Sequence, residues 1–300
     1  NGFKIKTGEG VSASPEIVAR IEAIIEEVQA GGEVRRMPLD VAGKQGLVAH
    51  LDPEPQYFEH IGSLVDLDGL RRAGIKVVAD SMYGTASGYL RHLLEGGRTQ
   101  VIEVHSERNP LFPGLRNPEP IDINLGELSR AVVEAGAGVG VATDGDADRL
   151  GVVDEKGQYM TTLQVLPLLA LYLLEVRGER GAIVRSHTTS NMLARLGERF
   201  GVPVYETPVG FKYIGNKMLE VDALLGGEES GGYAFRGHVA ERDGILSALY
   251  FLDLMVRRGK TPSQCLDHLY SLVGPHHYTR QDMTFRAEER EAIRQRLQSA

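Results

Sequence analysis

The chain contains very little cysteine, no tryptophan and no long run of apolar residues. Cys265 is its single cysteine, so no disulfide can form within the chain, which favours a cytoplasmic protein. We expect Cys265 to be buried in a helix. The longest apolar run, 163–174, is interrupted by Gln164 and Pro167 and falls short of the ~20 residues of a membrane span. No signal peptide is visible. We therefore expect no membrane partner.

The chain also lacks an excess of basic residues, because its formal net charge is −8. Proteins that bind nucleic acid hold the phosphate backbone with clustered Lys and Arg, and no such cluster stands out here. We therefore expect no nucleic-acid partner, whereas small anionic ligands remain compatible with a local basic site. With 300 residues and 42% hydrophobic content, about two domains or slightly more are expected. We expect a monomer or a homodimer.

Strand-like and helix-like segments alternate along most of the chain. This alternation predicts α/β domains in three layers, with mixed and mostly parallel sheets, and the two αβ units are candidates for structural copies. Strands are expected at 75–80, 100–104, 138–143, 182–185, 202–205 and 223–225. Helices are expected at 84–94, 125–135, 163–176, 189–200, 245–258 and 263–273.

The two ends of the chain have patterns of their own. Residues 1–6 suggest a short strand, and Ser14 followed by Pro15 predicts the start of a helix that reaches about residue 30. At the other end, a strand over 277–285 and a charged helix over 287–299 predict the start of a further α+β domain. Because the sequence begins at an Asn in strand-like sequence, we expect the true N-terminus to lie further upstream.

Three aspartates follow a predicted strand in the segment Thr143-Asp-Gly-Asp-Ala-Asp-Arg149. Asp144, Asp146 and Asp148 alternate with small residues, so a curled loop can aim three carboxylates at one point. Converging carboxylates repel one another and raise each other's pKa values unless a cation joins them. Ligands that are all oxygen suit a hard ion such as Mg²⁺. The pattern therefore predicts a magnesium site.

Two other interpretations of this acidic loop remain open. An EF-hand calcium loop also begins with Asp-x-Asp-x-Asp, and Glu155 falls at its twelfth position. However, its sixth position requires Gly and is Arg149 here, and the flanking sequence is strand-like rather than helical. A solvated acidic turn is the second alternative. Arg149 stands against it, because an arginine directly after the acids suits an anion bound beside the cation.

Two glycine-containing segments further along are candidate ligand loops. In Gly226-Gly-Glu-Glu-Ser-Gly-Gly232, the glycines let the backbone approach a ligand, and a carboxylate beside a hydroxyl suits neighbouring sugar hydroxyls. A solvated glycine-rich loop is an equally good interpretation of these residues. The segment 207–215 reads as an ordinary turn into a helix, whose first backbone amides attract anions.

The acidic loop resembles the metal-binding loop of the α-D-phosphohexomutase family, which comprises the phosphoglucomutases and phosphomannomutases. The resemblance implies that Asp144, Asp146 and Asp148 hold Mg²⁺. It also implies that Arg149 lies beside the phosphoryl group that is transferred and takes part in catalysis.

The loop 227–231 is similar to the sugar-binding loop of the same family. The resemblance implies that Glu228 and Ser230 bind two adjacent hydroxyls of the hexose. It also makes Gly210 and Lys212 substrate contacts, because the family has a substrate-recognition segment of this form at 207–215.

Three further residues are assigned by resemblance. In the family, Asn-Gly-Phe-Lys follows the loop of the catalytic phosphoserine, which makes Lys4 a catalytic candidate for handling phosphate or a proton; a surface lysine is the simpler interpretation. Some family members carry His where this chain has Gly232, so the general base is left open. His238 is a weak candidate for that role, because a lone histidine is more often structural.

The resemblance spans nearly the whole chain. It implies the tail of domain I at 1–52, domain II with the metal loop at 53–158, domain III with the sugar loop at 159–273 and the start of domain IV at 274–300. Neither the phosphoserine loop nor the Arg-x-Ser-Gly-Thr-Glu-Pro phosphate loop of the family is found. We therefore expect these 300 residues alone to be inactive or nearly so.

The implied activity is the interconversion of α-D-hexose 1-phosphate and 6-phosphate, through a phosphoserine and a hexose 1,6-bisphosphate that serves as intermediate and activator. The Glu-Glu-Ser-Gly-Gly form tilts the expected substrate towards glucose and mannose phosphates rather than an amino sugar. Two alternatives stay open. One is a Mg²⁺-dependent sugar-phosphate phosphatase with an aspartate nucleophile, and the other is a non-catalytic module that binds sugar phosphates.

Overall fold

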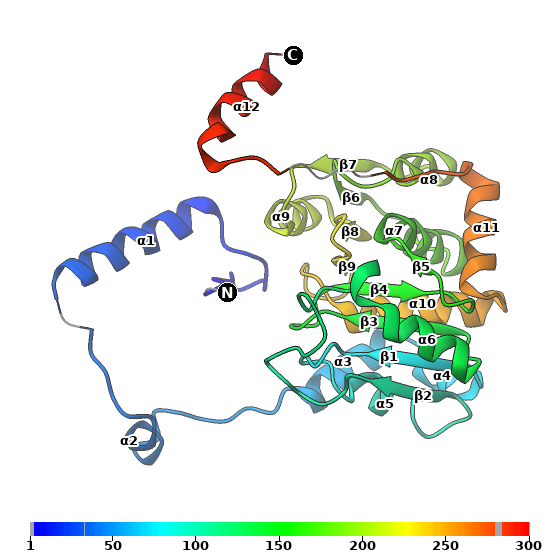
Figure 1. Cartoon of the computed structure of the whole chain (residues 1–300), viewed down its shortest axis with the longest axis horizontal. Helices are drawn as coiled ribbons and strands as arrows, with labels where there is room; N and C mark the ends of the chain where they lie inside the picture. The colour runs from blue at the N-terminus through cyan, green and yellow to red at the C-terminus, as the bar shows by residue number, and fades with distance from the viewer. Residues whose placement is uncertain (1–2, 33, 280–283, 300) are drawn as a thin grey trace.

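Two mixed β-sheets form the centre of the protein, and each belongs to its own α/β unit (Figure 1). The structure is a computed structural model that describes residues 3–32, 34–279 and 284–299. Helices lie against both sheets, so the prediction of layered α/β domains with mixed sheets is confirmed.

The first sheet has the strand order β2-β1-β3-β4-β5. Strand β1 pairs in parallel with β2 and with β3, whereas β3, β4 and β5 pair in antiparallel fashion. As expected for parallel strands, β1 and β3 are buried along nearly their whole length. The strands are β1 (Lys76–Asp80), β2 (Gln100–Val104), β3 (Val139–Thr143), β4 (Leu150–Val153) and β5 (Tyr159–Met160).

The second sheet repeats the order of the first four strands. Its order is β7-β6-β8-β9, with β6 parallel to β7 and β8, and β9 antiparallel to β8. The two units are therefore copies in topology, as the sequence suggested. Its strands are β6 (Ile183–Ser186), β7 (Val204–Thr207), β8 (Leu225–Gly227) and β9 (Tyr233–Phe235).

Helices connect the strands and cover the sheets. The first unit contains α3 (Glu54–Leu64), α4 (Leu67–Arg72), α5 (Tyr89–Leu94), the 3-10 turn η1 (Asp122–Asn124) and α6 (Gly126–Ala135). The second contains α7 (Thr162–Leu171), the π-helical turn η2 (Tyr172–Val176), α8 (Met192–Phe200), α9 (Phe211–Val221), α10 (Gly244–Arg258) and α11 (Pro262–Val273).

Helix α10 joins the two units. Asp243 caps its first turn by accepting the backbone N–H of Leu246 at 2.8 Å, and Gly259 ends it in the left-handed conformation. Every residue from 244 to 255 is buried, and the helix contacts β3, β4 and β9. One apolar cluster accordingly contains residues of both sheets. Cys265 in α11 is 1% exposed, which confirms its predicted burial.

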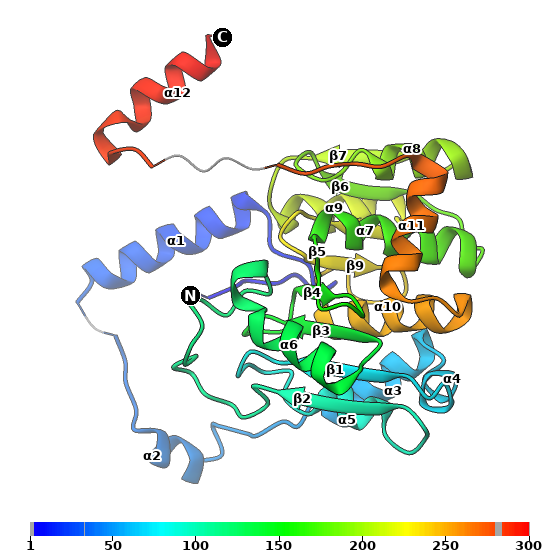
Figure 2. The ribbon, with the colours of Figure 1, turned by 45° about the vertical axis from the view of Figure 1, so that its right-hand side comes forward.

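Three helices lie away from this body (Figure 2). Within the described chain, α1 (Pro15–Ala30), α2 (Leu39–Lys44) and α12 (Arg290–Gln298) contain no buried residue. The 3-10 turn η3 (Ala287–Glu289) precedes α12. The predicted helix at 15–30 and the cap at Ser14 are confirmed.

Some boundaries differ from the prediction. The expected helix 84–94 starts only at Tyr89, because residues 84–88 form a turn that packs on the acidic loop. Helix α3 and strand β9 were not predicted. The predicted strand 277–285 lies partly on 280–283, outside the described residues, and its described ends are irregular. The predicted strand 1–6 includes residues 1 and 2, also outside, and its described part makes a single bridge between Lys6 and Ser12.

Among the helices in the described ranges, none combines the length and the apolar character that crossing a membrane requires.

Candidate functional site

The acidic loop lies between β3 and β4 and is shaped by its own first aspartate. Asp144 Oδ1 accepts the backbone N–H groups of Asp148 at 2.8 Å and of Arg149 at 3.0 Å. Ala147, at φ 61°, adopts the left-handed conformation that closes the curl. One ligand oxygen from each of Asp144, Asp146 and Asp148 can be chosen so that all lie within 4.8 Å of one another. The structure therefore brings the three predicted ligands together.

Three neighbouring segments hold this loop. The N–H of Thr85 donates to Gly145 O at 3.1 Å, and the N–H of Gly145 donates to Pro118 O at 3.2 Å. From the other side, the N–H of Gly244 at the start of α10 donates to Ala147 O at 2.9 Å. The position of the carboxylates is thus fixed by backbone contacts from both units.

The carboxylates destabilise one another in the absence of a counter-charge. Burial and the negative charges of Asp148 and Asp146 raise the pKa of Asp144 to about 8, although Arg149 opposes the shift. Burial likewise raises the pKa of Asp148, and Arg242 opposes that shift. A cation among these oxygens would relieve the repulsion and keep the acids ionised.

The donor set fits a hard divalent cation. Its ligand atoms are carboxylate oxygens from one short loop, of which Asp144 is buried, Asp148 is partly buried and Asp146 is exposed to ligands from solvent. Mg²⁺ prefers such oxygens and keeps coordination positions for water or phosphate. Nothing in the geometry of the loop favours the EF-hand interpretation, because strands rather than helices flank it.

Arg149 lies over the acidic loop. Its Nε is 3.6 Å from Asp144 Oδ2 and 3.8 Å from Asp148 Oδ1, and its Nη1 donates to Glu119 Oε1 at 3.2 Å. The Nε is buried, with no hydrogen-bond partner among the described residues. A guanidinium with an unused donor beside a cation site is suited to an anionic oxygen.

The glycine-rich loop connects β8 to β9, the same position that the acidic loop has in the first unit. Ser230 Oγ donates to Glu228 Oε1 at 2.7 Å, and Glu228 is 6% exposed. The two predicted sugar ligands are therefore adjacent, as a carboxylate and hydroxyl that bind neighbouring sugar hydroxyls would need to be.

The two loops are joined directly. The N–H of Leu150 donates to Gly231 O at 2.9 Å, and Arg149 forms an isolated β-bridge with Gly232. Arg242 adds a side-chain link between Asp148 and Glu228, which it bonds with its two terminal nitrogens. The predicted cation ligands and sugar ligands thus form one site.

The second glutamate of the loop has a different environment. Glu229 accepts hydrogen bonds from Ser186 Oγ at 2.8 Å and Thr188 Oγ1 at 2.5 Å. Burial alone would raise the pKa of Glu229, but the hydrogen bonds from Thr188 and Ser186 outweigh burial and lower it. Glu229 therefore organises the loop after β6, whereas Glu228 faces Arg242.

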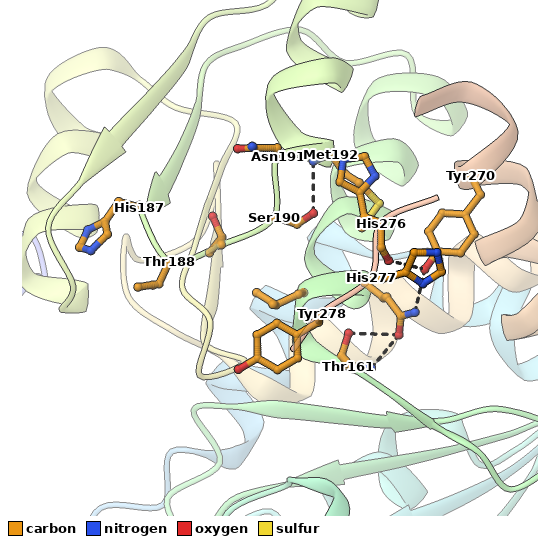
Figure 3. Close-up of a pocket in the computed structure, with 13 residues that line it drawn as sticks. Thr161, His187, Thr188, Ser190, Asn191, Met192, Tyr270, His276, His277 and Tyr278 are labelled. Carbon is orange, nitrogen blue, oxygen red and sulfur yellow. Dashed lines mark hydrogen bonds between the residues drawn. The ribbon is translucent and has the colours of Figure 1, made fainter. Parts of the chain in front are cut away.

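That loop after β6 borders a cavity of about 480 Å³ (Figure 3). Figure 3 shows Thr188, Tyr278 and Thr161 around one part of the cavity, with His276 and Tyr270 further along. The thirteen lining residues carry mainly hydroxyl, amide and imidazole groups. The cavity adjoins the glycine-rich loop through Thr188, the donor to Glu229.

Gly210 and Lys212 lie at the start of α9. Gly210 precedes the helix at φ 124°, which only glycine adopts readily, and Lys212 is exposed, with its Nζ 4.9 Å from the centre of the Tyr213 ring. Phe211 between them is buried and lies under the Arg242 guanidinium, 5.5 Å from its central carbon. The segment thus reaches the joined loops through Phe211.

Lys4 is exposed and has no hydrogen bond or ion pair recorded within the described chain. Its neighbour Lys6 pairs with Glu241, which also accepts from Ser12 Oγ at 3.3 Å. Glu241 precedes Arg242, so the N-terminal segment does lie beside the site.

His238 has a structural setting. Its Nε2 is 3.1 Å from Asp243 Oδ2, and its Nδ1 is 3.0 Å from His60 Nε2. Tyr57 Oη also donates to Asp243, at 2.9 Å. This network joins α3 to the cap of α10, so nothing in it places His238 against the acidic loop.

Sequence reasoning missed Arg242 as a site residue. It lies in Glu241-Arg-Asp-Gly244, where the aspartate that caps α10 was the visible signal. Burial alone would lower the pKa of Arg242, but Asp148, Glu228 and Glu241 raise it, so the guanidinium stays charged. Two loops that both carry acids suggest a basic side chain between them, but the sequence does not indicate which one. Only the fold identifies Arg242.

Fold and loops together define a pair of α/β/α domains with a loop of three aspartates and a glycine-rich loop at neighbouring strand ends. The family model described as phosphoglucomutase/phosphomannomutase, alpha/beta/alpha domain II matches residues 55–157, and that of domain III matches residues 163–273. The chain belongs to the phosphoglucomutase/phosphomannomutase family.

Similar proteins agree with this assignment. A phosphoglucomutase/phosphomannomutase of Thermococcus kodakarensis is 32% identical over 90% of this chain and 57% of its own length. A phosphoglucosamine mutase of Arthrobacter is 32% identical over 87% of this chain and 55% of its own. The crystal structure of a candidate phosphomannomutase from Thermus thermophilus superposes with a TM-score of 0.79 and 37% identity, over 89% of this chain and 58% of that one. The chain thus spans somewhat more than half the length of these proteins.

Proposed function

We propose that the protein containing this chain is a phosphohexomutase, an intramolecular phosphotransferase of the isomerase class. The observation that supports this most directly is the joining of the acidic loop to the glycine-rich loop by Leu150, Gly231 and Arg242. A cation site beside a pair of hydroxyl ligands is what a reaction on a phosphorylated sugar requires. The membership of the family supports the same class of reaction.

The proposed reaction proceeds in two transfers. A phosphoserine gives its phosphoryl group to the free hydroxyl of a hexose monophosphate, whose proton is lost, and a hexose 1,6-bisphosphate forms. The serine oxygen then takes the phosphoryl group from the other end of the sugar, and that end regains a hydroxyl proton. The phosphoserine is restored, and the phosphate has moved between O1 and O6.

In this proposal the chain supplies binding and charge. Its three aspartates hold Mg²⁺, which when bound neutralises charge on the phosphoryl group. Arg149, whose side chain is partly exposed, donates a terminal guanidinium N–H to a phosphoryl oxygen, and Lys4 is a further candidate for handling phosphate or a proton. Glu228 and Ser230 orient the sugar by two adjacent hydroxyls, so positioning supplies much of the rate. Gly210 and Lys212 are proposed as further substrate contacts.

The proposal extends to which sugar phosphate is the substrate. We propose glucose and mannose phosphates, and phosphoglucosamine mutases among the similar proteins make the amino sugar the competitor to test. We further propose a cytoplasmic protein that is a monomer or a homodimer. The domain division at residues 52, 158 and 273 also stays a prediction.

The decisive assay uses the longer protein with Mg²⁺ and a trace of glucose 1,6-bisphosphate. Glucose 1-phosphate, mannose 1-phosphate and glucosamine 1-phosphate are compared, and formation of each 6-phosphate is followed by ³¹P NMR. Conversion to a 6-phosphate supports the mutase, and the ratio of rates identifies the sugar. Release of free phosphate alone would instead support a phosphatase.

The 300-residue chain alone allows a second test. We expect no turnover, but we expect binding of glucose 1-phosphate in saturation-transfer NMR. Glu228→Gln and Ser230→Ala should each abolish the signal, because each removes a hydroxyl ligand. Glu134→Gln, an exposed residue of α6, is the matched control and should leave the signal unchanged. Equal signals in all four proteins would contradict the assignment of the sugar loop.

A further inference from the structure

Arg242 lies between the two loops and bonds an acid of each. Its Nη2 is 2.5 Å from Asp148 Oδ2, and its Nη1 is 3.1 Å from Glu228 Oε1. Its Nε lies 3.7 Å from Glu241 Oε1, and its guanidinium rests on the Phe211 ring. One side chain therefore engages a proposed cation ligand and a proposed sugar ligand at the same time.

The reach of Arg242 depends on Gly232. A Cβ atom at position 232 would lie 2.1 Å from Arg242 Cδ, 2.8 Å from its Cγ and 3.3 Å from Glu228 Oε1. Real Cβ atoms essentially never come within 3.0 Å of another heavy atom, so any side chain at 232 would displace the arginine. The φ of Gly232 lies outside the left-handed range, so its own backbone conformation does not exclude alanine. The aliphatic part of the Arg242 side chain thus occupies the space that a side chain at position 232 would need.

Arg242 and a divalent cation cannot both use Asp148 fully. The guanidinium bonds Asp148 Oδ2, which leaves Oδ1 for a metal ion, and two cations on the two oxygens of one carboxylate repel each other and share its charge. Arg242 has other acids within reach, because Glu228 and Glu241 already lie beside it. Displacement from Asp148 therefore leaves the arginine paired.

We propose that Arg242 competes with the divalent cation for Asp148, and that cation binding shifts the arginine onto Glu228 and Glu241. The inference rests on the proposed function in taking the acidic loop as a cation site and, for the linkage between the loops, in taking Glu228 as a sugar ligand. Because Glu228 is also the proposed sugar ligand, the cation changes the engagement of the sugar loop. Binding at the two loops is then thermodynamically linked, and the linkage is reciprocal.

The test measures Mn²⁺ affinity of the 300-residue chain by the EPR signal of the free ion. Arg242→Gln should bind Mn²⁺ about tenfold more tightly than wild type, the factor expected for loss of one competing charged hydrogen bond. Gly232→Ala should also bind more tightly, because it displaces the arginine without removing its charge. Circular dichroism confirms that each variant is folded.

Arg258→Gln is the matched control. Arg258 lies in the last turn of α10, pairs with Glu175 at 2.5 Å and is 16% exposed, so its replacement removes the same charge far from Asp148. Its Mn²⁺ affinity should stay within about twofold of wild type, because Arg258 is already paired with Glu175 and lies roughly 20 Å along α10 from the acidic loop, beyond the screening length. An equal gain in Mn²⁺ affinity in Arg242→Gln and Arg258→Gln would show that only the net charge of the protein matters, and it would overturn the competition.

A second readout follows the arginine itself. The Nε–H resonance of Arg242, identified by its absence from Arg242→Gln, should shift saturably with Mg²⁺ in wild-type protein. Unchanged or weaker Mn²⁺ binding by Arg242→Gln would contradict the competition but not the cation site. So would an Nε–H resonance that does not shift with Mg²⁺ although the wild-type protein binds the ion. Absence of Mn²⁺ binding in wild type and in all three variants would contradict the cation site of the proposed function as well.

Discussion

Gly244, the first residue of α10, offers a specific test of how the acidic loop is held. A Cβ atom there would lie 2.4 Å from Arg149 O, 2.9 Å from Ala147 O and 3.0 Å from Arg149 C. These are backbone atoms of the loop, so they cannot turn away as a side chain could. Gly244→Ala should therefore push the loop and α10 apart.

The magnitude follows from the geometry. The shortest contact must open by about 0.6 Å merely to reach 3.0 Å, and overpacking of this kind costs about 1–3 kcal/mol. Alanine returns roughly 0.5–1 kcal/mol through its helix propensity, so the net loss of stability is about 0–2.5 kcal/mol. The affinity for the cation should fall by about 10–100-fold, the usual effect of disturbing the residues that hold metal ligands in place.

The assay pairs urea unfolding with Mn²⁺ titration. The control is Gly126→Ala, which also changes a glycine at the first position of a helix, α6, but has no heavy atom within 4 Å of its new Cβ. That control should keep its cation affinity and gain up to about 1 kcal/mol. Should Gly244→Ala bind Mn²⁺ as wild type does, the idea that α10 positions the acidic loop is wrong.

Three further outcomes are expected. Asp146→Asn should weaken Mn²⁺ binding at least tenfold and leave the urea midpoint of the metal-free protein unchanged or slightly higher, because it removes a proposed ligand oxygen and one of three mutually repelling charges; unchanged affinity would contradict its role. The hydrogen bond that His105 Nδ1 donates to the Asp80 carboxylate raises the pKa of His105 against the effect of burial. The stabilisation from the protonated imidazole is therefore present below pH 6.5 and is lost as the pH rises through the folded-state pKa, so urea midpoints should fall across that window in wild type and stay flatter in His105→Asn. Leu249→Ala, at a fully buried position of α10, should cost about 2–5 kcal/mol in urea unfolding, and a loss below 1 kcal/mol would refute its place in the shared core.

The acidic loop could be predicted from the sequence because its parts are local. Asp144, Asp146 and Asp148 lie within five positions and shape themselves, since Asp144 accepts the amides that close the curl. The glycine-rich loop was predicted as a sugar-binding loop only through the family resemblance. The fold shows that it lies against the acidic loop. Their junction at Leu150 and Gly231 links residues 81 positions apart and leaves no trace in either local pattern.

The errors have a common physical cause. Residues 84–94 have helical character, but the chain at Gly84 lies so close to the acidic loop that a Cβ atom added there would be 2.6 Å from Gly145 O. This packing on the acidic loop imposes a turn over the first residues of the segment. Strand β9 has three residues, too few to show an alternation by which it could be recognised. Arg242 was passed over because its significance depends on two acids from different loops. Tertiary contacts, which local patterns do not encode, decided each case.

The sharing of α10 between the two sheets has a consequence for the order of synthesis. The first sheet is complete once Met160 has been made, and α6 then already packs on β3 and β4, but α10, which packs on their other face, begins only at Gly244. At ordinary ribosomal rates, roughly 80 further residues take about 4–16 s. During that interval the nascent chain presents an uncovered apolar sheet face. Chaperones that bind such faces should therefore associate with ribosomes stalled before α10 and leave once it has emerged.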